Sequence, residues 1–215
     1  MNKKNAIQLI DISHSYDGRQ ILNNLAFSVG YGEKLIFNAP SGFGKSTIFN
    51  MIMGFLQPER GRVIVDGMEV TEDTAKDVRS KIAFLPQNMM LPNASVRDFI
   101  HTIEKFDANL EVGLNMDVLK MLFKELQLPE DVCDAKLNML SGGEKQRLML
   151  AIVIALDKKI LLLDEALSGV DIERAEKVLN YLSGIKDLSI VFISHDSRHM
   201  GIGDFKKLEV SYHGS

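Results

Sequence analysis

Short apolar runs alternate with longer amphipathic stretches along most of this chain. A short apolar run bounded by turn residues predicts a buried strand, because a strand covered on both faces has no polar side. Apolar residues spaced three or four apart predict helices that cover such strands. The predicted strands are 7–12, 24–29, 34–38, 62–65, 82–85, 160–163 and 188–193, and the predicted helices are 45–55, 96–106, 118–126, 141–156 and 172–182.

The order of these elements predicts an α/β domain. Strands that alternate with helices form a parallel sheet with helices on both faces. The stretch 87–140 differs, because its periodicity is helical and it shows little strand signal. We therefore expect a single domain, 1–215, in which a core formed by 1–86 and 141–215 carries a helical insertion at 87–140.

The composition of the chain mainly excludes certain classes of protein. The chain has 25 Lys and Arg against 29 Asp and Glu, so its net charge of −4 does not favour binding to nucleic acid. The single cysteine, Cys133, excludes an internal disulfide and indicates a reducing compartment. The apolar runs are too short to cross a bilayer, and the first residues do not form a secretion signal. We therefore expect a cytoplasmic protein.

A loop rich in turn residues, at 39–47, joins an apolar strand to a helix. Such a loop binds phosphate, because successive backbone amides and the positive end of the helix face the anion. Lys45 is placed to contact the β- and γ-phosphates of a nucleotide, and the Ser46 hydroxyl is placed to ligate Mg²⁺. The alternative is an ordinary turn, and the first glycine of the phosphate-loop pattern is replaced by Ala39.

Two carboxylates, Asp164 and Glu165, follow the apolar run Ile160–Leu163. The carboxyl end of a buried strand is where the ligand crevice of an open α/β sheet lies. Asp164 is therefore placed to hold Mg²⁺ through water, and Glu165 to orient or deprotonate an attacking water. A carboxylate pair that begins a helix is the alternative interpretation.

The run Leu140-Ser141-Gly142-Gly143-Glu144-Lys145-Gln146-Arg147 resembles the signature of the ATP-binding cassette (ABC) ATPases. Other motifs of that family follow in the same order over nearly the whole chain. The resemblance assigns Tyr16 to adenine stacking, 39–47 to the Walker A loop, Gln87 to the Q-loop, Asp164 and Glu165 to the Walker B pair, 168–171 to the D-loop and His195 to the switch histidine.

The resemblance implies a P-loop NTPase (RecA-like) core with an N-terminal antiparallel β-subdomain, and an inserted α-helical subdomain that carries the signature at its end. It also implies an ATPase that uses ATP and Mg²⁺. The implied catalytic residues are Glu165, His195, Gln87 and Lys45. The implied Mg²⁺ ligands are Ser46, Gln87 and Asp164. The implied nucleotide contacts are Tyr16, Ser41, Gly42, Phe43, Gly44, Lys45, Ser46 and Thr47, with Ser141, Gly142 and Gly143 reaching the nucleotide of a paired cassette.

The resemblance further implies partners. Two cassettes, either identical or paralogous, pair head to tail with two ATP molecules between them. A separate membrane permease uses the resulting movement, so the cassette is expected at the cytoplasmic face of the inner or plasma membrane. The alternatives are a membrane complex that moves no solute, of the cell-division or lipoprotein-release type, and an ATPase of iron–sulfur assembly.

Some positions depart from the family pattern. Phe43 stands where a small residue is usual, and the D-loop reads Ser-Gly-Val-Asp in place of Ser-Ala-Leu-Asp. We expect Phe43 to face the partner's D-loop, with Gly169 and Val170 small enough to leave room for it. Ile152 replaces a common arginine, and Ala166 a common proline.

Overall fold

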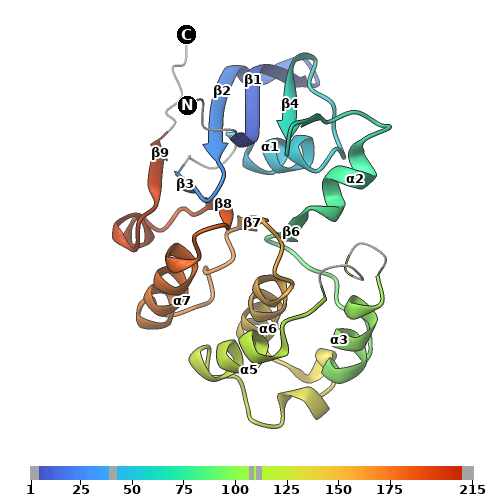
Figure 1. The fold of residues 1–215 in the computed structure, drawn as a ribbon, viewed down its shortest axis with the longest axis vertical. Coiled ribbons are helices and arrows are strands. Elements are labelled where there is room, and N and C mark those ends of the chain that lie inside the picture. Colours follow the sequence, from blue (N-terminus) through green and yellow to red (C-terminus); the bar gives the residue numbers. More distant parts are fainter. Residues whose placement is uncertain (1–4, 39–42, 107–108, 110–112, 210–215) are drawn as a thin grey trace.

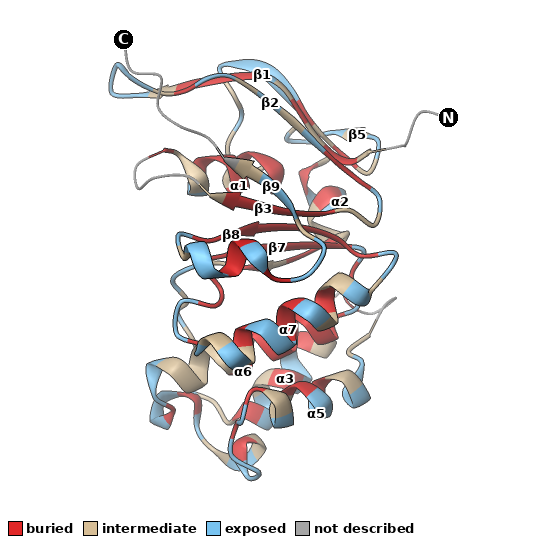
Figure 2. Ribbon diagram, turned by 90° about the vertical axis from the view of Figure 1, so that its left-hand side faces the viewer, coloured by how far each residue is buried: buried red, intermediate tan, exposed pale blue. Residues whose placement is uncertain are grey.

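The structure is a computed structural model that describes residues 5–38, 43–106, 109 and 113–209. Figure 2 shows its layers from one side: a curved antiparallel sheet, then helices α1 and α2, then a parallel sheet, then helices α6 and α7, with α3 and α5 beyond them. The predicted α/β architecture is confirmed. The antiparallel sheet that the family resemblance implied is also present.

The antiparallel sheet has the strand order β2-β1-β4-β5. Tight turns join β1 to β2 and β4 to β5, and both central residues of each turn have positive φ: Asp17 and Gly18 in the first, Asp66 and Gly67 in the second. Two-residue hairpin turns of this kind match the twist of the strands that they join. The strands are β1 (Asn5–Tyr16), β2 (Arg19–Gly30), β4 (Arg60–Val65) and β5 (Met68–Glu69).

The parallel sheet has the order β6-β7-β8-β3-β9, and each neighbouring pair of strands is parallel. Its strands are β6 (Ile82–Leu85), β7 (Ile160–Asp164), β8 (Ser189–Ile193), β3 (Lys34–Asn38) and β9 (Lys206–Glu209). The apolar pattern predicted four of the five strands. It missed β9, because an edge strand that begins with two exposed lysines does not form an apolar run.

Four of the described helices begin at a residue whose side chain caps them. Ser95, Asn115, Ser141 and Asp171 each accept a hydrogen bond from a backbone N–H of the first turn. The first helix ends earlier than predicted, because Gly54 has a φ of 71° and turns the chain. The helices are α1 (Lys45–Ile52), α2 (Ala75–Ser80), α3 (Val96–Glu104), α5 (Met116–Glu125), α6 (Gly142–Ala155) and α7 (Ile172–Gly184) (Figure 1).

Alternate residues of the parallel strands point to opposite faces and form two apolar cores. One core joins Ile36, Leu163 and Phe192 to the helices α3, α5, α6 and α7. The other joins Phe37 and Leu162 to α1 and the antiparallel sheet. The described part of 87–140 contains α3, α5 and two short 3₁₀ helices. That the helical subdomain begins at 87 and ends at 140 stays a prediction.

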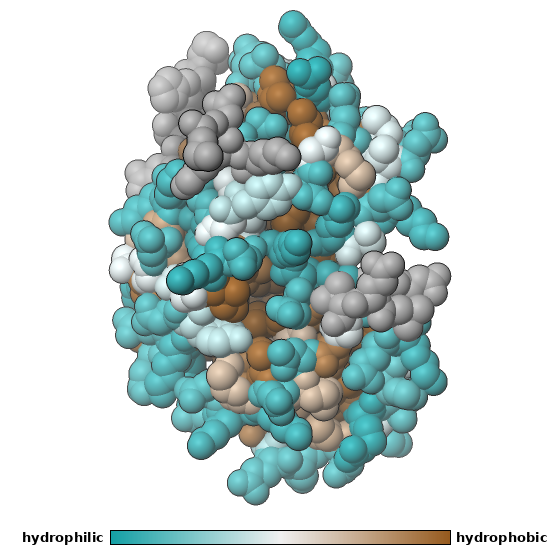
Figure 3. All heavy atoms as spheres, viewed as in Figure 1, coloured by the Kyte–Doolittle hydropathy of each residue, from teal (hydrophilic) through white to brown (hydrophobic). Residues whose placement is uncertain are grey.

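The face of the molecule that Figure 3 shows is mostly hydrophilic among its described residues. Figure 3 shows hydrophobic side chains gathered near the middle of one face, over the region between α7 and α6, with hydrophilic ones around them. Within the described residues, no helix is long and apolar enough to cross a membrane.

Candidate functional site

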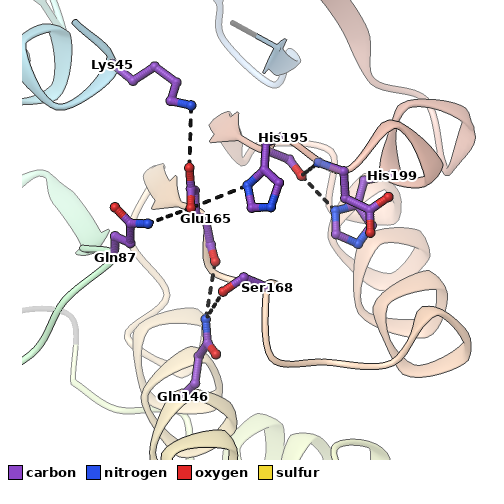
Figure 4. A network of polar contacts seen from close by, with 9 residues as sticks. Lys45, Gln87, Gln146, Glu165, Ser168, His195 and His199 are labelled. Atoms are coloured by element: carbon purple, nitrogen blue, oxygen red, sulfur yellow. Dashed lines mark hydrogen bonds and ion pairs between the residues drawn. The ribbon is translucent and has the colours of Figure 1, made fainter. Parts of the chain in front are cut away.

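The four predicted catalytic residues lie together at the carboxyl edge of the parallel sheet (Figure 4). Lys45 begins α1 after β3, Gln87 follows β6, Glu165 follows β7 and His195 follows β8. Parallel strands end at the same edge of a sheet, so residues far apart in sequence meet there. The structure therefore brings the predicted constellation into one place.

Glu165 is the centre of this group. Its carboxylate accepts a hydrogen bond from Gln87 Nε2 at 2.6 Å. It also lies 3.4 Å from Lys45 Nζ and 3.4 Å from His195 Nδ1. The Lys45 and Glu165 side chains are each only 11% exposed, whereas His195 is 62% exposed. The carboxylate is thus held from three sides and partly shielded from water.

The backbone at Glu165 fixes where this carboxylate points. Glu165 has a φ of 51°, which is uncommon for a residue with a side chain. Its N–H donates to the carbonyl oxygen of Ile193 at 2.9 Å, and its own carbonyl accepts a hydrogen bond from Gln146 Nε2 at 3.2 Å. Left-handed backbone of this kind persists only where the surrounding contacts determine it. Both contacts therefore help to direct the Glu165 side chain.

Asp164 has a different environment, although it is the adjacent residue. It is the last residue of β7 and only 5% exposed. Burial, followed by the negative charge of Glu165, raises its pKa from 3.8 to about 6, although Lys45 and a hydrogen bond from Ser46 act in the opposite direction. Asp164 is therefore a buried carboxyl group beside a hydroxyl.

The start of α1 presents backbone amides at this edge. Gly44 precedes the helix with a φ of 88°, and a Cβ at this position would lie 2.6 Å from Cγ2 of Ile21. Only glycine combines that backbone conformation with so close an approach. Thr47 is buried in the first turn. The predicted contacts Ser41 and Gly42, together with Ala39, lie outside the described residues.

Tyr16, the predicted adenine-stacking residue, ends β1 and is 48% exposed. Its ring meets the ring of His14 edge to face, with 4.9 Å between the centroids. His14 pairs with Leu22 of β2, and Leu22 packs close to Gly44. The exposed aromatic ring is therefore connected by packing to the start of α1.

The signature residues lie at the start of α6. Ser141 caps the helix, its hydroxyl donates to Glu144 Oε2 at 2.7 Å, and its N–H donates to the same oxygen at 2.8 Å. Ser141 and Gly142 are exposed and Gly143 is half-buried. The hydrogen bonds from Ser141 also lower the pKa of Glu144. The signature thus forms an ordered helix N-terminus that faces outward.

The structure contradicts one expectation. Phe43 does not face outward toward a paired cassette, because its side chain is buried and lies 5.9 Å from the Phe37 ring, centroid to centroid. The residue that packs on Gly169 is Gln146 of the same chain. Gly169 and Val170 are therefore not small to accommodate Phe43. Any contact of Phe43 with phosphate can come only from its backbone.

Two supporting contacts were not predicted. Gln146 Nε2 donates to Ser168 Oγ at 2.9 Å as well as to the Glu165 carbonyl. Ser194 Oγ lies 2.8 Å from His199 Nδ1 and accepts a hydrogen bond from Asp196 N–H, which shapes the loop that carries His195. Gln146 belongs to the signature run, but sequence spacing does not reveal where its amide points.

Comparison with known proteins agrees with this arrangement. The family model described as "ABC transporter" matches residues 22–168. The mitochondrial iron–sulfur clusters transporter ATM1 of Candida glabrata is 34% identical over 92% of this chain and 28% of its own length. The spermidine/putrescine import ATP-binding protein PotA of Vibrio vulnificus is 33% identical over 88% of this chain and 50% of its own length. The chain thus spans half or less of these relatives.

Solved structures show the same fold. A bacterial Atm1-family ABC exporter with ATP bound has a TM-score of 0.80 and 25% identity, and the match covers 96% of this chain and 38% of the exporter chain. The dimeric structure of a bacterial ABC transporter cassette has a TM-score of 0.78 and 23% identity, with 94% of each chain covered. The second match bears on the fold alone. Together with the family match over residues 22–168, these findings establish that the chain belongs to the ABC transporter family, as an ATP-binding cassette.

Proposed function

We propose that this chain binds and hydrolyses ATP as the cassette of an ABC transporter. The observation that supports this most directly is the carboxylate of Glu165, held by Lys45, Gln87 and His195. When ATP enters, Lys45 contacts its β- and γ-phosphates and leaves Glu165 free to orient or deprotonate the attacking water. His195 then donates a hydrogen bond to the γ-phosphate, where negative charge is rearranged during the reaction.

The residues beside Glu165 fit a magnesium ion. Ser46 offers a hydroxyl, Asp164 a carboxylate and Gln87 an amide oxygen, and oxygen ligands of this kind are those that Mg²⁺ prefers. At Asp164, burial and the charge of Glu165 outweigh the opposite effects of Lys45 and Ser46 on the pKa, so a divalent cation would offset negative charge there. We assign these three residues to the ion. When bound here, Mg²⁺ would neutralise part of the negative charge of the phosphates.

We propose that the nucleotide sites are completed by a second cassette, either an identical copy or a paralogue. The exposed helix start at Ser141, Gly142 and Gly143 carries backbone amides and a hydroxyl, which suit a γ-phosphate presented by another chain. A solved cassette of the same fold is dimeric. Adenine stacks on the exposed ring of Tyr16.

We further propose that the paired cassettes drive a separate membrane permease from its cytoplasmic face. PotA is named an import ATP-binding protein, and another relative, NdvA of Rhizobium etli, is named a glucan export ATP-binding/permease protein. Just beyond Gln87, Met90 is fully exposed while Met89 packs partly against the core. A methionine beside the Q-loop suits an adaptable contact with such a partner.

The test compares the wild type with Glu165→Gln. We expect the wild type to hydrolyse MgATP, and the variant to lose at least about 100-fold in kcat, since it lacks the carboxylate that handles the attacking water. The variant should still bind ATP and should form a stable dimer with MgATP in light scattering. Equal hydrolysis by the two proteins would contradict the proposal.

A further inference from the structure

The D-loop, residues 168–171, lies directly against the first turns of α6. A Cβ built on Gly169 would lie 2.3 Å from Oε1 of Gln146 and 3.9 Å from Cα of Gly143. Gln146 is one turn along the helix from Gly142 and donates both to Ser168 Oγ and to the Glu165 carbonyl. One amide group thus connects the signature helix to the D-loop and to the residue that bears the hydrolytic carboxylate.

The far end of the D-loop is attached to the helical region as well. Asp171 caps α7 and pairs with Arg174, whose guanidinium also donates to Gln127 Oε1 just beyond α5. Arg174 Nε is buried and has no hydrogen-bond partner within the described residues. One end of the D-loop therefore contacts α6, and the other is linked through Arg174 to the residue just beyond α5.

We propose that Gln146 is a positioning residue that transmits the state of one ATP site to the other. The inference rests on the proposed function, because only a pair of cassettes places the signature of one chain on the nucleotide of its partner. A phosphate that engages Gly142 and Gly143 shifts the first turn of α6. Gln146 carries this shift to the Glu165 carbonyl in the same chain, where it adjusts the carboxylate of the other site.

Gly169 leaves the space that the Gln146 amide occupies. Its φ does not lie in the left-handed region, so alanine fits the backbone without strain. The methyl group would nevertheless occupy the place of the Gln146 amide, which is the flexible end of its side chain and would move away. Gly169→Ala is therefore a way to displace Gln146 without altering α6 itself.

The first experiment measures hydrogen exchange in the nucleotide-free chain. Amides of Glu165, Ser168 and Val170 all donate to backbone carbonyls, so their exchange reports local opening. We expect Gln146→Ala to speed their exchange about tenfold, the scale of two lost neutral hydrogen bonds. Gly169→Ala should act in the same direction. The exposed Gln57→Ala is the matched control and should leave these rates unchanged.

The double variant tests whether the two residues act together. In the Gln146→Ala background, Gly169→Ala should speed exchange no further, because the amide that it displaces is already gone. The proposal would be overturned if the two substitutions multiplied each other's effect on the exchange rates, or if Gln146→Ala left these rates unchanged. This part of the test does not require ATP hydrolysis, so it reports on the Gln146 contacts even if the proposed function fails.

Kinetics separate positioning from a merely structural role. Gln146→Glu keeps the size of the side chain but removes the N–H donor. We expect Gln146→Ala and Gln146→Glu to lower kcat about tenfold, with the KM for ATP changed less than twofold and the Hill coefficient for ATP reduced toward 1. A raised KM with unchanged kcat, or unchanged cooperativity, would contradict the transmission between sites.

Discussion

Replacing Asp164 by asparagine should stabilise the chain in the absence of nucleotide and Mg²⁺. Folding buries this carboxyl beside Glu165 and raises its pKa from 3.8 to about 6. At 1.36 kcal/mol per pKa unit, this rise corresponds to about 3 kcal/mol of folding free energy lost when Asp164 is ionised. Asparagine keeps the shape and the polar contact with Ser46 but carries no charge.

The sign of the pH dependence follows from the direction of the shift. Well below pH 3.8 the carboxyl is protonated in both folded and unfolded chains, so the wild type and the variant should be equally stable. Between pH 3.8 and about 6 the unfolded chain releases this proton while the folded chain keeps it, so the wild type loses stability; above about 6 both are ionised and the loss is constant. The advantage of the variant should therefore reach about 1.5 kcal/mol at pH 5 and about 3 kcal/mol at pH 7.5.

Urea unfolding in EDTA at these two pH values measures the difference. At neutral pH, the melting temperature should also rise by about 6–12 °C, using 2–4 °C per kcal/mol for a chain of this size. The control is Asp131→Asn, an exposed aspartate whose replacement should change stability by less than about 0.5 kcal/mol. A variant no more stable than the wild type, or one whose advantage shrinks as the pH rises, would refute the reasoning.

Two further predictions concern aromatic residues. Tyr16→Ala should raise the KM for ATP roughly tenfold, because base stacking is worth about 1–3 kcal/mol, whereas Tyr16→Phe should keep the wild-type KM; steady-state kinetics that show no effect of the alanine would remove Tyr16 from the site. Phe43→Ala should lower the free energy of unfolding by about 3 kcal/mol, since the ring is buried against Phe37. Chemical denaturation should give the same cost in a Gly169→Ala background, and a coupling above about 0.5 kcal/mol would show that Phe43 interacts with the D-loop of its own chain.

The sequence predicts most of the fold because the buried strands are continuous apolar runs. β7 and β8 are buried at every position, so they are readily recognised. β9 and the six-residue α2 escape the pattern, because one is a polar edge strand and the other is too short for a helical period. Tertiary pairing with β3 forms β9, and no local signal reports that pairing.

The candidate site, like the fold, could be predicted only in part from the sequence. Ordered motifs located Lys45, Gln87, Glu165 and His195, since strand ends bring such residues together whatever their separation in sequence. Side-chain direction was not predictable. Phe43 turns into the core and Gln146 turns toward the D-loop, and both depend on packing between elements that spacing along the chain does not encode.

The central claim is that each ATP site is built from two chains, and mixing two inactive variants tests it most directly. Lys45→Ala removes a residue from the chain's own site, whereas Ser141→Arg blocks the site of its partner. Each variant alone should be inactive. In a mixed dimer, one site keeps an intact Lys45 from one chain and an intact Ser141 from the other.

An equal mixture should therefore recover hydrolysis to about a quarter of the wild-type rate, because about half of the dimers are mixed and each has one intact site. The variants must first be shown by circular dichroism and by exchange of labelled chains to be folded and to form mixed dimers. Recovery of hydrolysis on mixing is the result that a shared site predicts. Mixed dimers that remain as inactive as either variant alone, or a Ser141→Arg chain that hydrolyses ATP at the wild-type rate, would contradict it.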